Sequence, residues 1–110
     1  MLRTLLLAAA AVLVATAASA QDAKIAKGME VYGAQKCAMC HSIAGKGNAK
    51  GPLDDVGSKV SAADMKAWIV DAVGMTAKTK AARSPKMKNY NLPPEELDAL
   101  VAYMMSLKKK

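Results

Sequence analysis

Five consecutive residues combine two thiols with an imidazole: Cys37, Ala38, Met39, Cys40 and His41 read Cys-x-x-Cys-His. This pattern is typical of covalent haem attachment. Two intervening residues let both sulfurs reach one edge of a porphyrin as thioethers, and the adjacent histidine can offer an imidazole nitrogen to the iron. The sequence therefore predicts one covalently bound haem c, with Cys37 and Cys40 as attachment points and His41 as an axial iron ligand.

Three other kinds of site use paired cysteines. An exported protein could join Cys37 and Cys40 in a structural disulfide, and a thioredoxin-like redox pair has the same spacing. The redox pair expects a βαβ context, which this sequence does not show. Structural zinc needs about four protein ligands, whereas the chain has two cysteines and one histidine. Haem attachment is favoured because His41 directly follows the second cysteine.

The first 20 residues have the features of a bacterial signal peptide. Arg3 supplies the positive charge, residues 5–18 are almost entirely apolar, and Ala18-Ser19-Ala20 forms an Ala-x-Ala cleavage pattern. An uncleaved membrane anchor is the alternative, but the apolar run is shorter than the roughly 20 residues of a spanning helix. We therefore expect residues 1–20 to be a cleaved signal peptide, residues 21–110 to form one periplasmic domain, and no membrane span to remain after cleavage.

Composition limits the partners that this chain could have. It contains 110 residues, no Phe, one Trp and three Tyr, so its apolar core is small unless a haem adds flat apolar surface. The net charge of +7 suits either simple solubility or attraction to an acidic partner. No nucleic-acid-binding motif is present, and export argues against that function.

Apolar periodicity predicts three main helices and no convincing strand. The first runs from about Asp22 to Gly33, the second from a Ser61 cap to Gly74, and the last begins near Pro94. Residues 44–57 and 76–91 are predicted to be irregular. The predicted apolar faces consist of Ile25, Met29 and Tyr32, then Met65, Trp68, Ile69 and Val73, then Leu97, Leu100, Val101 and Met104.

Two pairs of residues lie in the predicted helices before and after the haem motif: Gly28 with Tyr32 in the first helix, and Leu100 with Tyr103 in the last. With the motif, this arrangement resembles class I c-type cytochromes of the short bacterial kind, over essentially all of residues 21–110. The resemblance implies an all-α, small cytochrome c fold whose three main helices wrap around the haem. It also implies that the first and last helices cross closely through these two pairs.

Gly51-Pro52 matches a Gly-Pro pair that follows the haem histidine in that family. There the proline carbonyl usually accepts a hydrogen bond from the second histidine nitrogen, so the resemblance implies that Pro52 orients His41. Leu53 follows one residue sooner than in many members, which is a departure in the local backbone path.

One of the chain's eight methionines could be the second axial ligand. Elimination removes the initiator and the methionines on predicted helices or within the haem motif: Met29, Met39, Met65, Met104 and Met105. Met75 and Met87 remain, both in the predicted late loop. The resemblance selects Met87, because family members have a segment like Pro85-Lys86-Met87 shortly before the last helix.

A His/Met pair would fill both axial positions of the iron and leave no open site for a substrate. We therefore expect an electron carrier rather than an enzyme, working with redox partners such as a reductase or terminal oxidase. Lysines near the haem segments could guide docking to acidic surfaces on such partners: Lys36, Lys46, Lys50, Lys78, Lys80, Lys86 and Lys88. The alternatives are a dedicated haem subunit of an oxidoreductase complex, and a sensor or peroxidase-like enzyme with an open axial position.

Overall fold

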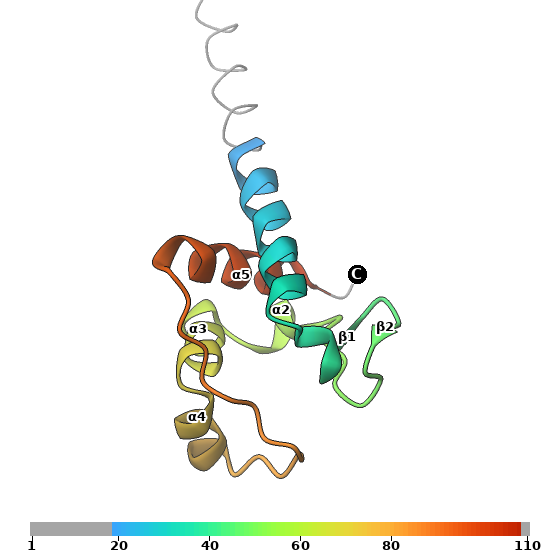
Figure 1. Ribbon diagram of the computed structural model, residues 1–110, viewed down its shortest axis with the longest axis vertical. Coiled ribbons are helices and arrows are strands. Elements are labelled where there is room, and N and C mark those ends of the chain that lie inside the picture. Colours follow the sequence, from blue (N-terminus) through green and yellow to red (C-terminus); the bar gives the residue numbers. More distant parts are fainter. Residues whose placement is uncertain (1–18, 109–110) are drawn as a thin grey trace, which may run out of the picture.

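The computed structural model describes residues 19–108 (Figure 1). This part of the chain consists mainly of helices joined by turns and irregular segments. Within that range the N-terminal helix covers residues 19–34. The remaining elements are η1 (Cys37–Met39), β1 (Ser42–Ile43), β2 (Lys46–Gly47), α2 (Val56–Lys59), α3 (Ala62–Val70), α4 (Ala72–Thr79) and α5 (Pro94–Ser106). The predicted all-α class is confirmed, and the short antiparallel β1–β2 hairpin is an addition that was not predicted.

Most of the predicted signal peptide, residues 1–18, lies outside the described residues, as do Lys109 and Lys110. Among residues 19–108, no helix is both long and apolar enough to cross a bilayer.

The N-terminal helix and α5 cross at Gly28 (Figure 1). A methyl group at Gly28 would press on the carbonyl oxygen of Ala99 and come within 2.6 Å of the Tyr103 Cβ. Ala99 is itself buried, with only 1% of its surface exposed. The predicted close crossing through Gly28 is thus confirmed, since no larger residue fits between the two backbones.

Tyr32 and Tyr103 form an edge-to-face pair beside the crossing. Their ring centroids are 5.8 Å apart and the ring planes meet at 89°, an arrangement that aromatic quadrupoles favour. The Tyr32 hydroxyl is buried and has no hydrogen-bond partner. Burial, followed by the nearby Cys37, Tyr103 and Asp54, raises the pKa of Tyr32 to about 12.

The apolar core draws on the N-terminal helix, α3 and α5. The predicted face of α5 is confirmed at Leu97, Leu100 and Met104, all buried. The predicted face of the first helix is wrong at Met29, whose side chain is 54% exposed. Val31 is buried in its place, because the crossing at Gly28 directs the residues three and four positions further along toward α5.

The second predicted helix is divided in two at Asp71. Ser61 caps α3 as predicted, since its hydroxyl accepts a hydrogen bond from the Asp64 N–H at 3.1 Å. Asp71 ends α3 and caps α4 by accepting from the Gly74 N–H at 3.1 Å. The prediction that Gly74 ends the helix is therefore wrong: α4 continues to Thr79.

The change of direction at Asp71 also overturns the predicted burial of Val73. That side chain is 63% exposed, whereas Met65 and Ile69 of α3 are buried as predicted. A single straight helix would have kept all three on one face, but α4 starts a new axis. Gly57 is a second correction, since it lies inside α2 rather than in a loop and packs against Met105 at the end of α5.

We predict that Gly28→Ala destabilises the purified protein by about 1–3 kcal/mol, because the added methyl group has no space at the helix crossing. The matched control is Gly33→Ala in the same helix, where nothing lies within 4 Å of the new methyl group. That change should leave stability unchanged or raise it by up to about 1 kcal/mol. Denaturant unfolding measures both, and equal effects would contradict a close crossing at Gly28.

We also predict that Tyr32→Phe raises the free energy of unfolding by about 1 kcal/mol, because it removes a buried hydroxyl that lacks a partner. The edge-to-face contact with Tyr103 is kept. Because the pKa of Tyr32 is raised from 10.0 to about 12 in the folded protein, the unfolded chain loses this proton first, and the stability of the wild type falls as the pH rises from 10 toward 12. The advantage of the Phe variant should therefore widen above pH 10 in thermal unfolding, and a less stable variant would refute the assignment.

Candidate haem-binding site

The Cys-x-x-Cys-His motif forms a tight turn directly after the N-terminal helix. Lys36 turns the chain with a left-handed backbone (φ 58°), and η1 follows as one 3₁₀ turn. The N–H groups of Cys40 and His41 both donate to the Cys37 carbonyl, at 3.1 and 3.0 Å. A 3₁₀ helix has three residues per turn, so side chains at i and i+3 lie above one another. The turn therefore brings the two thiols to the same side.

Both cysteines are free and half-buried. Burial raises the pKa of the Cys37 thiol, assisted by Cys40 and opposed by a backbone hydrogen bond. Reactive cysteines in redox pairs have the opposite property, a lowered pKa that stabilises the thiolate. The local environment thus favours a pair of attachment points over a thioredoxin-like redox centre.

His41 is held by a backbone carbonyl on its second ring nitrogen. Its Nδ1 lies 3.1 Å from the Gly51 carbonyl oxygen, so a protonated Nδ1 leaves the Nε2 lone pair available to a metal. Burial lowers the pKa of His41; the Gly51 hydrogen bond opposes this and the Arg83 charge adds to it. The imidazole is therefore kept neutral, which is the form that coordinates iron.

The acceptor is Gly51 rather than the predicted Pro52. Ser42 pairs with this segment as an isolated parallel bridge: its N–H donates to the Gly51 oxygen at 3.0 Å, and its own oxygen accepts from Leu53 N–H at 2.8 Å. Successive carbonyls in an extended chain point in opposite directions. Once Gly51 faces the residues next to His41, the Pro52 carbonyl faces away.

Residues 81–93 cross back toward the motif after α4 and have no regular secondary structure. Their path is fixed by hydrogen bonds: the Tyr90 N–H donates to Ile69 O at 2.8 Å, and the Val73 N–H donates to Asn89 Oδ1 at 2.9 Å. Burial raises the pKa of Tyr90, and Cys37 and Cys40 raise it further. This long-range coupling shows that the late segment lies near the two thiols.

Met87 lies in this late segment and is half-buried. It borders a hollow of about 350 Å³, whose other lining residues are Val73, Thr76, Ala77, Lys80, Ala81 and Lys86. Met75, the rival ligand, is also half-buried but belongs to α4 rather than to the predicted loop, and it does not line this hollow.

The residues of this site fit a covalently attached haem. The turn offers two thiols on one side, and His41 offers an oriented imidazole nitrogen. Met87 in the late segment carries a thioether, and half-buried apolar side chains such as Leu53, Tyr90 and Leu92 pack against the core. A covalent haem would use the thiols for attachment, the imidazole nitrogen as an iron ligand and apolar side chains around its ring.

Sequence reasoning missed Gly51, Tyr90 and Arg83 as residues of the site. Tyr90 gave a weak signal, because it is an aromatic residue in an otherwise basic segment. Arg83 gave none: its guanidinium donates to the Cys40 carbonyl across 43 positions of sequence, and no local pattern reports such a contact.

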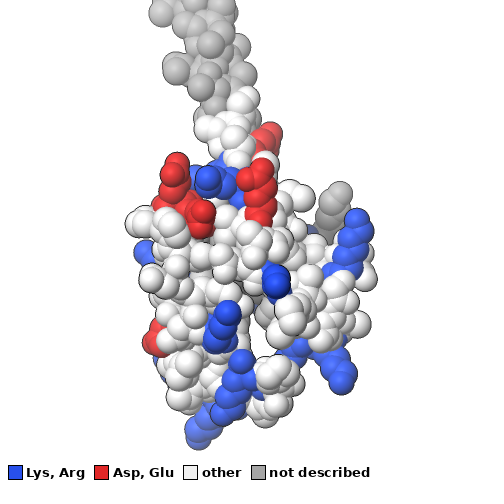
Figure 2. All heavy atoms as spheres, in the orientation of Figure 1, with Lys and Arg blue, Asp and Glu red and all other residues white. Residues whose placement is uncertain are grey.

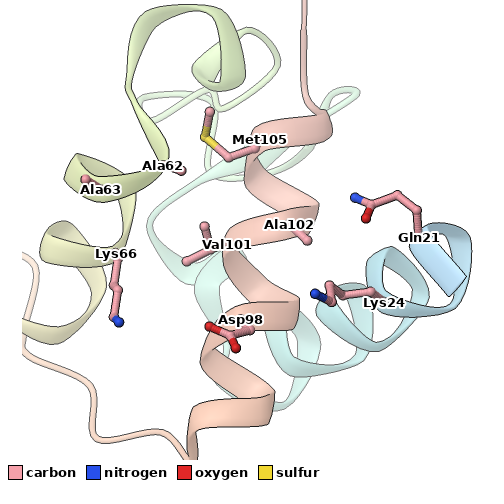
Figure 3. A pocket seen from close by; sticks show the side chains of 9 residues that line it. All are labelled: Gln21, Lys24, Ala62, Ala63, Lys66, Asp98, Val101, Ala102 and Met105. Atoms are coloured by element: carbon pink, nitrogen blue, oxygen red, sulfur yellow. The ribbon is translucent and has the colours of Figure 1, made fainter. Parts of the chain in front are cut away.

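A second hollow, of about 410 Å³, lies between the N-terminal helix, α3 and α5 (Figure 3). Val101, Ala102 and Met105 of α5 form part of its lining, with Lys24 on one side and Lys66 on the other. None of the cysteines, His41 or Met87 borders it, so it is separate from the candidate haem site.

Comparison with known proteins agrees with this geometry. The family model described as Cytochrome c matches residues 25–108, which include the haem motif and the late segment. Neither the curated proteins nor the solved structures gave a match. The family match covers most of the 110 residues, and from it we conclude that the chain belongs to the cytochrome c family and is an electron-transfer protein with covalently bound haem c.

Proposed function

We propose that the protein carries single electrons between redox partners outside the cytoplasmic membrane, through one haem attached at Cys37 and Cys40 with His41 and Met87 as axial ligands. The observation that carries this proposal is the arrangement of the motif turn. It presents both free thiols together, and the Gly51 carbonyl orients His41. Met87, which borders a hollow in the late segment, is the favoured second ligand.

The bound haem supplies a one-electron couple between ferric and ferrous iron. The protein residues determine how that couple behaves. Cys37 and Cys40 would hold the cofactor on the motif turn, and the Gly51 carbonyl holds His41 Nδ1, which would leave Nε2 for the iron. The Met87 thioether would be a soft ligand that favours the ferrous state. With His41 and Met87 both as ligands, the iron would have no open site for a substrate and would exchange electrons by an outer-sphere route.

Export is part of this proposal and is supported by the sequence alone. Cleavage after Ala20 would leave residues 21–110 as the mature domain in a bacterial periplasm.

The alternative is a dedicated haem subunit of a larger oxidoreductase complex. Among the described residues, four large apolar side chains are exposed: Met29, Met39, Val70 and Val73, at 54%, 72%, 38% and 63%. They belong to four elements, the N-terminal helix, η1, α3 and α4, and four side chains fall short of the roughly 20–30 residues a side that a stable interface uses. This observation favours a diffusible carrier.

Basic side chains dominate one end of the protein. In Figure 2 most visible acidic side chains lie in the upper part of the molecule, beside the N-terminal helix and over the start of α5, whereas the lower part of that face, over α4 and the late segment, carries mainly Lys and Arg. All seven lysines predicted to guide docking are exposed. A charge separated in this way attracts an acidic partner to the end that carries the late segment.

We predict that Met87→Ala abolishes the weak long-wavelength absorption band that a methionine–ferric haem bond gives, and lowers the reduction potential, because the thioether no longer stabilises ferrous iron. Met75→Ala is the matched control, with a methionine of the same partial burial. It should keep the band and the potential. Absorption spectra of the oxidised protein and a redox titration measure both quantities, and loss of the band in Met75→Ala alone would assign the ligand to Met75.

We predict that a triple change of Lys46, Lys50 and Lys86 to Glu slows reduction by ferrocyanide at least about tenfold at low salt, because steering of anions toward the haem is reversed. Reduction by hexaammineruthenium, a cation, should become faster. The control exchanges Lys24, Lys27 and Lys66 for Glu. These three residues are also exposed, and Lys24 and Lys66 line the hollow between the N-terminal helix, α3 and α5, which is separate from the candidate haem site. Stopped-flow rates that change equally in both triple variants would show an effect of net charge alone.

A further inference from the structure

Arg83 links the late segment to the haem motif. Its Nη2 atom donates a hydrogen bond to the carbonyl oxygen of Cys40, the residue that precedes the axial histidine. Arg83 lies on the segment that carries Met87, four positions before it. One side chain therefore connects the two parts of the chain that hold the haem on its two sides.

The same guanidinium lies against Gly51. A methyl group at Gly51 would collide with Arg83 Nη1 and come within 2.8 Å of its Cζ. The carbonyl of Gly51 accepts the hydrogen bond from His41 Nδ1. Arg83 thus contacts the residue that orients His41 as well as the carbonyl immediately before His41. Only a residue without a side chain at position 51 leaves this space to the guanidinium.

The charge of Arg83 is permanent and reaches the imidazole. A guanidinium stays protonated at all physiological pH values, and its contacts with the Cys40 carbonyl and Gly51 place this charge beside the backbone on both sides of the His41 hydrogen bond. A positive charge beside the acceptor carbonyl also draws electron density away from the hydrogen bond that makes a histidine ligand more basic. Both effects leave less electron density for ferric iron.

We propose that Arg83 is a positioning residue that raises the reduction potential of the haem, by placing a fixed positive charge on the Cys40 and Gly51 backbone that holds His41. This inference rests on the proposed function, because it concerns the potential of the same haem. It is distinct from ligand binding, since Arg83 acts through the backbone around His41. It is also distinct from docking, which depends on exposed lysines.

The test compares the midpoint potentials of haem-loaded wild type, Arg83→Gln, Arg83→Lys and Lys86→Gln. We expect Arg83→Gln to lower the potential, so that the ratio of oxidised to reduced protein at a fixed ambient potential rises about tenfold, or about 59 mV for one electron. Arg83→Lys keeps the charge and should recover most of that shift. Lys86→Gln removes an equal charge from the same segment. Among the described residues, Lys86 has no hydrogen bond to the haem motif, so this variant should change the ratio by much less.

The absorption band of the methionine–iron bond separates an altered charge from an altered structure. If Arg83→Gln keeps the band and lowers the potential more than Lys86→Gln does, the proposal is supported. Equal shifts in the two variants would overturn it. If Arg83→Gln loses the band, the Arg83→Lys variant decides between the two explanations. A normal band with a wild-type potential in Arg83→Lys supports the proposal. A normal band with a lowered potential in Arg83→Lys refutes it, and so does loss of the band in that variant.

The comparison of potentials does not depend on which methionine is the second ligand. If the wild-type band proved to depend on Met75, or were absent, the proposed His41/Met87 ligation would fail. The potentials of Arg83→Gln and Lys86→Gln alone would then report whether Arg83 sets the potential, because Arg83 contacts the Cys40 carbonyl and the Gly51 backbone that holds His41.

Discussion

The crossing of the N-terminal helix over α5 is the constraint on which the rest of the structure depends. The haem motif follows the first of these helices after two residues, and the Met87 segment leads directly into the second. Fixing the two helices at Gly28 therefore fixes the starting point of the haem motif and the end point of the late segment. Edge-to-face packing of Tyr32 on Tyr103 sets the rotation of the helices about this contact.

Around that crossing, the protein has a small apolar core for its length. Within residues 19–108, six buried side chains from three helices form the central cluster, and many neighbouring apolar residues are only half-buried. A chain without Phe has few large side chains with which to enlarge such a core. Haem c supplies a broad apolar surface, so the cofactor contributes to packing as well as to electron transfer.

The site divides its work between local and distant parts of the chain. The 3₁₀ turn sets the spacing of the two thiols by itself, within four residues. Orientation of His41 comes from Gly51, ten positions away, and the charge beside it comes from Arg83, more than forty positions away. The spacing of the thiols is thus a property of one motif, whereas the surroundings of His41 are assembled from three segments.

The sequence by itself determined the features that depend on neighbouring residues: the haem motif, the Ser61 cap, the start of α5 at Pro94 and the inward face of that helix. These rest on hydrogen bonds and side-chain periodicity within a few positions, which a single chain displays directly. The close approach of another helix at Gly28 could also be predicted, because a glycine inside a helix leaves space for a neighbouring backbone. The Asp71 cap of α4 is local too, a contact with Gly74 three positions on, but the continuing apolar pattern had predicted one helix there. Tertiary structure decided the rest: the bridge to Ser42 turned Gly51 instead of Pro52 toward His41, and packing of the late segment brought Arg83 to the motif. Both outcomes depend on which distant backbone group comes within reach, and sequence spacing carries no record of that.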